Sequence, residues 1–371
     1  MNSSRPDRIY GPDDFVNDAQ ARTYRVLSRL MRGADASKLI RGGGYIEDTA
    51  ILGTGGTARY YRPGETRSPS NGDGTANYRY GFRFIEADKS WTEQQIKAQG
   101  GSDMLTKFKN FRKILDIQLH TMKCGFMENA FWARPDANLM ESQSPTDGKG
   151  AIYSIPAMVN HSTNTLPVAN STSGSSAFTT IGNIAPTGAN VNWQNATGSY
   201  SGANPESPTQ GLFAAFDSVT FDIGFEAVPG LSTYKDNVEF SKLAIFTSKK
   251  GRTLYQGQIR ERNADLRAGP QDPAYANPVW NGVPIEGVDQ IAGGLLNPAA
   301  NYTTDYDDDK QPFWFLNFNF WEFAFQEGAF MQKREPMSGG VLQPDSMTQF
   351  MFSHPVVACT SRRRQAVVYG T

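Results

Sequence analysis

Residues 103–128 carry the apolar repeat of a single helical face. Asp103 is a suitable helix start, and no proline interrupts the stretch before Pro135. At 1.5 Å per residue, such a helix is about 39 Å long. The pattern predicts one long helix that packs an apolar stripe against a core. The stripe recurs at spacings of three and four residues, at Met104, Phe108, Phe111, Leu115, Leu119, Met122 and Phe126.

The other side of this predicted helix is basic. Only Asp103, Asp116 and Glu128 oppose the cations there. A solvated helix face explains this charge, and so does contact with a polyanion such as DNA. The predicted basic face consists of Lys107, Lys109, Arg112, Lys113 and Lys123.

A second, shorter amphipathic pattern precedes it. Four arginines three or four residues apart lie opposite Tyr24, Leu27, Leu30 and Met31, which predicts a short helix with a basic stripe. This stripe is either a solvated face or part of an arm that lies along an acidic partner. Its members are Arg22, Arg25, Arg29 and Arg32.

Residues 45–61 and 76–88 alternate with the period of strands, and residues 62–75 between them are rich in proline and glycine. The pattern predicts a long two-stranded hairpin. Because an isolated hairpin is marginally stable in water, we expect this one to lean on another subunit. Its mixed charges suit register-specific contacts between copies. They include Arg59, Arg62, Arg67, Arg79 and Arg83, balanced by Glu47, Asp48, Glu65, Asp73 and Glu86.

The second half of the chain is dominated by strand patterns. Together with the long helix they predict a mixed α+β fold with a large sheet core. Residues 160–210 are different: they are Asn, Ser, Thr, Gly and Pro with one charged residue, Glu206, and we expect an ordered, loop-rich insertion with short strands. Strands are predicted at 219–226, 242–247, 313–325, 350–353 and 356–360, a strand with a tight turn at 280–291, a turn at 248–252, and a strand or helix at 254–262.

Composition narrows the function classes. The chain has 371 residues and a net charge of −1, so nothing global indicates nucleic acid or an anionic membrane. Its two cysteines, Cys124 and Cys359, cannot form a disulfide framework, and buried thiols are favoured over a bridge. The sequence has no secretory pattern and no apolar run long enough to span a membrane.

Candidate chemistry is sparse. His120, His161 and His354 lack metal-ligand spacing, and there is no CxxC motif. The glycine-rich run at 53–57 lacks the Lys-Ser/Thr of a phosphate loop, and the acids at 305–309 form only part of a calcium loop. We therefore expect no cofactor, no metal site and no enzymatic activity.

The order of these parts, together with several short motifs, resembles the major capsid proteins of tailed bacteriophages. The motifs are YRYGFRFIEADKSWTEQQI, the run Asn263-Ala264-Asp265-Leu266, Asp272-Pro273-Ala274-Tyr275, Trp280-Asn281-Gly282-Val283-Pro284 and residues 359–365. The resemblance covers roughly residues 40–371 and leaves the 160–210 insertion unexplained.

The resemblance implies the tailed-phage major capsid fold, divided along the chain as that family is. An N-terminal arm would comprise residues 1–41 and an extended two-stranded loop residues 42–90. A peripheral domain with the spine helix and a long sheet would comprise 91–218 and 301–371, and an axial domain 219–300.

The implied function is self-assembly into hexamers and pentamers that form the icosahedral head shell around packaged double-stranded DNA. The implied partners are many copies of the chain, a portal, a separate scaffolding protein and a cement or decoration protein, with the subunit made in the host cytoplasm. Residues 42–88 contain no lysine, so the covalent cross-link of some family members is not expected here.

Two alternatives remain open. One is an encapsulin-type compartment shell with the same fold and a protein cargo. The other is a β-rich carbohydrate-binding surface protein.

Overall fold

The computed structural model combines helices and sheets, as the sequence predicts. Its helices include α2 Arg25–Gly33, α3 Glu93–Lys97, α4 Met104–Phe131, α6 Ile155–Met158, α7 Leu212–Val219 and α8 Lys249–Arg262. The structure describes residues 24–33, 39–40, 44–53, 74–98, 103–133, 140, 150–159, 178, 180–186, 188–200, 211–220, 242–262, 278–288, 291, 311–338 and 345–370.

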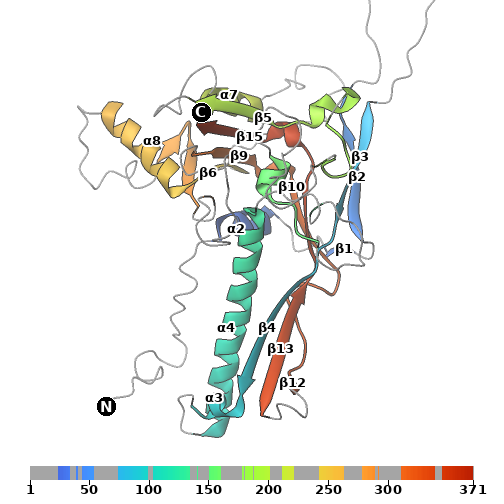
Figure 1. Cartoon of the computed structure of the whole chain (residues 1–371), viewed down its shortest axis with the longest axis vertical. Coiled ribbons are helices and arrows are strands. Elements are labelled where there is room, and N and C mark those ends of the chain that lie inside the picture. Colours follow the sequence, from blue (N-terminus) through green and yellow to red (C-terminus); the bar gives the residue numbers. More distant parts are fainter. Residues whose placement is uncertain are drawn as a thin grey trace, which may run out of the picture.

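The body of the molecule is built around a sheet with the strand order β5-β15-β9-β6-β8-β7. Its two middle strands, β9 Phe313–Asn317 and β6 Leu243–Thr247, are buried along their whole length, as their unbroken apolar runs predict. Helices α7 and α8 pack against this sheet (Figure 1). The other strands are β5 Ala196–Tyr200, β15 Ala366–Gly370, β8 Val283–Gly287 and β7 Val279–Trp280.

A long arm extends from the body, formed by α4 beside two paired strands (Figure 1). Strands β4 Ile85–Thr92 and β13 Ser346–Ser353 are antiparallel over eight residue pairs. Short strands β11 Gln332–Lys333 and β12 Met337–Ser338 also pair with β13. Near the body, β1 Leu39–Ile40, β10 Trp321–Gln326 and β14 Pro355–Cys359 form a further sheet.

The predicted hairpin is present as β2 Tyr45–Ile51 paired with β3 Thr75–Gly81. Its tip, residues 54–73, lies outside the described residues. The continuous second strand predicted at 76–88 is wrong, because residues 82–84 interrupt it and the rest joins β13 as β4.

The hairpin does not depend on another subunit for all of its burial. One face packs onto this chain's own core through Tyr78 and Tyr80, and Tyr78 stacks on Trp193. The Arg79 amide donates to the Gly182 carbonyl at 2.8 Å. Gly182 has a φ of +59°, and a Cβ there would meet the Tyr80 ring at 2.7 Å, so only glycine fits this approach.

Helix α4 confirms the predicted helix and extends to Phe131, but its buried face differs from the predicted stripe. Leu115 and Leu119 are buried against β4 and β13, while Met104, Phe108, Met122 and Phe126 are exposed. Burial continues instead along Lys123, Met127, Glu128 and Phe131. Lys123 therefore does not belong to a solvated basic face, as the sequence suggested.

Other details also differ from the prediction. Residues 249–252 are the first turn of α8, with the Ser248 hydroxyl accepting from the Gly251 amide at 2.9 Å as a helix cap. The tight turn predicted within 280–291 is confirmed: it joins the β7–β8 hairpin, with Asn281 and Gly282 at positive φ. In the predicted insertion, a turn at 181–184 and strand β5 are ordered. Residues 221–226 lie outside the described residues.

A buried arginine joins the C-terminal strands to two earlier segments. The Arg362 guanidinium donates to the Met158 carbonyl at 2.7 Å, the Trp193 carbonyl at 2.8 Å and Asn195 Oδ1 at 3.2 Å. Burial lowers its pKa to about 10, so it stays charged at neutral pH. Beside it, the Gln365 side chain makes two bonds to the backbone of Asn317, at 2.9 and 3.2 Å. The Gln365 bonds tie the start of β15 to the end of β9, and the Arg362 bonds tie the same segment to residues 158 and 193–195.

Arg362→Met is expected to destabilise the subunit by about 3 kcal/mol, because it leaves buried carbonyls without a charged donor. Arg363→Met is the matched control: Arg363 is exposed and donates to Asn192 Oδ1 at 3.1 Å, so the change should stay within about 0.5 kcal/mol. Urea unfolding followed by tryptophan fluorescence measures both. A loss below about 1 kcal/mol for Arg362→Met would show that the Arg362 hydrogen bonds are not important for stability.

Lys123→Met is expected to stabilise the subunit by about 2 kcal/mol at pH 7. Lys123 is 0% exposed, and within the described part of the chain its Nζ makes no hydrogen bond. Burial lowers the pKa of Lys123 from 10.5 to about 8, with Cys124 and Glu86 opposing the shift.

The sign of its pH dependence follows from that pKa shift. Between about pH 8 and 10.5 the unfolded chain holds a proton that the folded chain has lost, so this group makes stability rise with pH there. The difference in unfolding free energy between wild type and Lys123→Met should therefore shrink across this interval. Lys109→Met is the control on the exposed face of α4, and its unfolding free energy should follow that of wild type across this pH interval. A difference that is independent of pH would refute the burial of a charged amine.

Candidate functional site

The outer face of the β2–β3 hairpin is exposed to solvent, and the sequence analysis had predicted that this hairpin contacts another subunit. Ile51 is 81% exposed, and Tyr45 also projects from this face. The polar pair Thr49 and Asn77 bond across the strands at 2.8 Å. An aliphatic side chain this exposed, on a two-stranded ribbon anchored along its other face, is suited to contact with another chain.

The two described arginines of the predicted loop have roles within the subunit. Arg79 pairs with Glu47 on the neighbouring strand at 3.0 Å and lies over the Tyr45 ring at 3.8 Å. Arg83 is buried, donates to the Met140 carbonyl and has its pKa lowered by burial. Arg83 is therefore engaged within its own subunit, and its predicted contact with another subunit stays a prediction. Arg59, Arg62, Glu65 and Arg67 lie outside the described residues.

The predicted N-terminal helix is α2, and its arginines face an acid that the sequence analysis did not identify. Arg25 and Arg29 both pair with Glu286 of β8, Arg25 at 3.3 Å. Arg29 also lies 5.8 Å from the Phe246 ring centre. Arg22 lies outside the described residues, and the side chain of Arg32 is not described. The charge of the two described arginines is thus partly neutralised by an acid of the same subunit.

The start of α2 is held by a second acid, from the long helix. The Glu128 carboxylate accepts from the backbone amides of Val26 at 3.1 Å and Leu27 at 2.9 Å. These amides have no partner within the helix, and an anion is favoured at this end of the helix dipole. Burial nevertheless raises the pKa of Glu128, against the lowering effect of these hydrogen bonds. Glu128 was predicted to oppose a solvated basic face and instead joins α2 to α4.

The basic face of α4 is exposed along its first half. Lys109, Arg112 and Lys113 are exposed, and Lys107 is half-buried and donates to the Lys97 carbonyl at 3.1 Å. Asp116, the acid nearest to them, pairs with Lys333 at 2.8 Å. These four cations lie within two turns of the first half of α4, and α4 begins at the end of the arm next to α3 (Figure 1).

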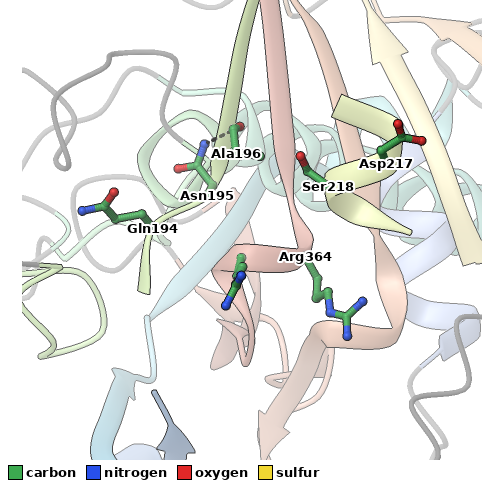
Figure 2. Close-up of a pocket in the computed structure, with 7 residues that line it drawn as sticks. Gln194, Asn195, Ala196, Asp217, Ser218 and Arg364 are labelled. Atoms are coloured by element: carbon green, nitrogen blue, oxygen red, sulfur yellow. Dashed lines mark hydrogen bonds between the residues drawn. The ribbon is translucent and has the colours of Figure 1, made fainter. Parts of the chain in front are cut away.

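One pocket of about 430 Å³ lies where β5, α7 and the segment before β15 meet (Figure 2). Its polar groups are largely engaged in structural bonds. Asn195 accepts from Arg362, Ser218 donates to the Ala214 carbonyl at 2.8 Å, and Gln194 donates to the Pro186 carbonyl at 2.8 Å. The lining residues provide no nucleophile paired with a base, and they are Gln194, Asn195, Ala196, Asp217, Ser218, Arg363 and Arg364.

The remaining candidates for chemistry are dispersed. His120 bonds the Asp116 carbonyl at 2.8 Å, and His354 bonds the Gln326 side chain at 2.8 Å, while His161 lies outside the described residues. Cys124 and Cys359 are free thiols, and burial raises the pKa of Cys359 to about 12. Among the described residues, no group of three acids, histidines or cysteines could hold a metal ion, and no helix could cross a membrane.

No family model and no curated protein matches the chain. Solved structures do match, and they include capsid chains. The chain of the cyanophage A-1(L) capsid asymmetric unit aligns over 96% of this chain and 94% of its own, with 13% identity and a TM-score of 0.56. The capsid of a native GTA particle aligns over 97% and 95%, with 8% identity and a TM-score of 0.53. The capsid of an empty GTA particle aligns over 96% and 92%, with 10% identity and a TM-score of 0.52. The chain therefore has the fold of phage capsid proteins.

Proposed function

We propose that this chain is a major capsid protein of a tailed bacteriophage, whose copies form the hexamers and pentamers of an icosahedral head shell around double-stranded DNA. The observation that carries the proposal is the shared fold, which extends over nearly the whole of this chain and of the capsid chains it matches. A likeness confined to one domain would leave the remaining segments without a role.

The division of labour within the subunit is part of the proposal. The arm of α4, β4 and β13 would belong to the peripheral domain, the sheet around β6 and β8 to the axial domain, and the β2–β3 hairpin to the extended loop. Heterologous contacts that close by rotation make rings. Slightly different contacts of the same chain can join rings of five and six into a shell.

The hairpin supports this proposal by its two faces. Its inner face is buried within the subunit through Tyr78 and Tyr80, which holds the two strands in place on the body. Its outer face exposes Ile51 and Tyr45, which would become buried against a neighbouring copy. Interfaces that are obligate for assembly usually bury such apolar surface.

Contact with packaged DNA would be independent of sequence and would weaken as salt rises. Arg22, Arg25, Arg29 and Arg32 were the first candidates, but Glu286 already engages Arg25 and Arg29. The basic face of α4, with Lys107, Lys109, Arg112 and Lys113, is the other candidate for phosphate contact. A portal, a scaffolding protein and a cement protein complete the proposed set of partners.

Expression of the full chain, alone and with its neighbouring gene products, tests the proposed function. Sedimentation and negative-stain electron microscopy should find rings or closed shells of megadalton mass. Shells that enclose DNA distinguish a phage head from a compartment that encloses a protein cargo. A protein that stays a monomer of 40.9 kDa under every condition would refute the proposal.

Ile51→Asp is expected to block assembly while leaving the subunit folded. The side chain is already in water in the isolated subunit, so its replacement should change the unfolding free energy by less than about 0.5 kcal/mol. Burying the new carboxylate in an interface would cost several kcal/mol. Ile51→Val is the control and should assemble like wild type. If Ile51→Asp gave a normal yield of shells, measured by sedimentation, the outer face of the hairpin would not be part of an interface between subunits.

A further inference from the structure

The first half of α4 exposes large apolar side chains between its cations. Leu105 is 61% exposed and Phe108 is 46% exposed. Lys109 and Arg112 are exposed beside them, on the same helix. The spacings 105, 108, 109 and 112 place all four on neighbouring positions of one helical surface. We call these four residues the basic–apolar patch.

We propose that the basic–apolar patch binds an acidic amphipathic helix of a different protein. Helices of that kind lie along an apolar surface with side-chain anchors at i, i+3, i+4 and i+7. Leu105 and Phe108 provide the apolar contact, and Lys109 and Arg112 flank it with charges that glutamate or aspartate residues of the partner would pair. The inference rests on the proposed function, under which this partner would be a protein that assists shell assembly.

The charge of the patch is not fully balanced by nearby acids in the described part of α4. Asp116 pairs with Lys333 at 2.8 Å. Asp103 lies at the start of the helix, where hydrogen bonding to Thr106 lowers its pKa. Asp103 also interacts electrostatically with Lys109, so it offsets part of the patch's charge, and the two cations Lys109 and Arg112 still leave the patch positive. An acidic partner gains charge complementarity that a neutral one does not.

Two other occupants fit the patch less well. Phosphates would satisfy Lys109 and Arg112 but would gain nothing from Leu105 and Phe108, whose apolar surface is stabilised by contact with another apolar surface. A second copy of the same patch would bring like charges together, which is unfavourable. Only a partner that is both apolar and acidic matches all four side chains.

The same helix contains a matched control surface. Met122 and Phe126 are 48% and 58% exposed on the second half of α4, so they are as apolar and as accessible as the patch. The nearest lysine there, Lys123, is buried. Within α4, this second surface has no exposed lysine or arginine beside its apolar side chains. A change there therefore tests whether the peptide binds by hydrophobic contact alone.

The test uses the purified full-length subunit and a fluorescent helical peptide of about 18 residues, long enough to be helical in water. The peptide carries leucines at i, i+3, i+4 and i+7 and glutamates on either side of them. A second peptide has lysines in place of the glutamates, and a short DNA duplex is the third probe. Binding is measured by fluorescence anisotropy at constant ionic strength, with circular dichroism to verify that each variant is folded.

We expect the acidic peptide to bind wild type, and both Phe108→Ser and the double change Lys109→Glu with Arg112→Glu to weaken it by about tenfold or more, which is 1.4 kcal/mol. Phe126→Ser should stay within about twofold of wild type. The doubly reversed variant should instead prefer the lysine peptide.

Three results would overturn the inference. They are equal losses for Phe126→Ser and Phe108→Ser, no loss on charge reversal, or failure of the acidic peptide while the duplex binds through Lys109 and Arg112. Each leaves the proposed function intact if shells still form. Conversely, if the subunit bound the acidic peptide but never assembled, the binding role of the patch would be supported and the proposed capsid function would be refuted.

Discussion

The burial of α4 against two different surfaces is the constraint on which the rest of the structure depends. Its first half packs on the paired strands β4 and β13 through Leu115 and Leu119. Its last turns pack into the body through Met127 and Phe131. Residues four apart advance by about 40° around a helix, so the line 115, 119, 123, 127 and 131 winds from one surface to the other. One continuous rod thereby fixes the arm relative to the body.

The sequence predicted the existence of this helix but not its winding contact. Spacings of three and four describe a straight stripe, and the stripe is real at Leu115 and Leu119. Periodicity cannot tell which part of an apolar stripe is covered, because coverage depends on strands that lie more than 200 residues away in the chain, such as β13. For the same reason Lys123 was assigned to solvent from its charge alone. The buried strands β6 and β9 were easier to predict, since an unbroken apolar run is buried whichever element packs on it.

The candidate surfaces illustrate a second limit. Arg25, Arg29 and Arg83 all looked like groups available to a partner, yet each has a partner within the chain. Glu286 and the Met140 carbonyl, which engage them, are far away in sequence, and no local pattern marks them. Glu128 could have been suspected from its place among apolar neighbours on the long helix, because a lone acid there requires donors. The surfaces that remain accessible, Ile51 on the hairpin and the exposed side of α4, are recognised only when burial is known.

The pairing of β4 with β13 has a consequence for the time at which the subunit can fold. Residues 85–92 and 346–353 are separated by more than 250 positions, and Tyr80 bonds the Cys359 carbonyl across a similar separation. At a synthesis rate of about 5–20 residues per second, the earlier strands wait on the order of 10–50 s for their partners. During that interval the hairpin, β4 and the apolar side of α4 are all exposed on a nascent chain. When many copies of the chain are synthesised at once, such incomplete chains coexist, and their exposed apolar surfaces make aggregation compete with folding.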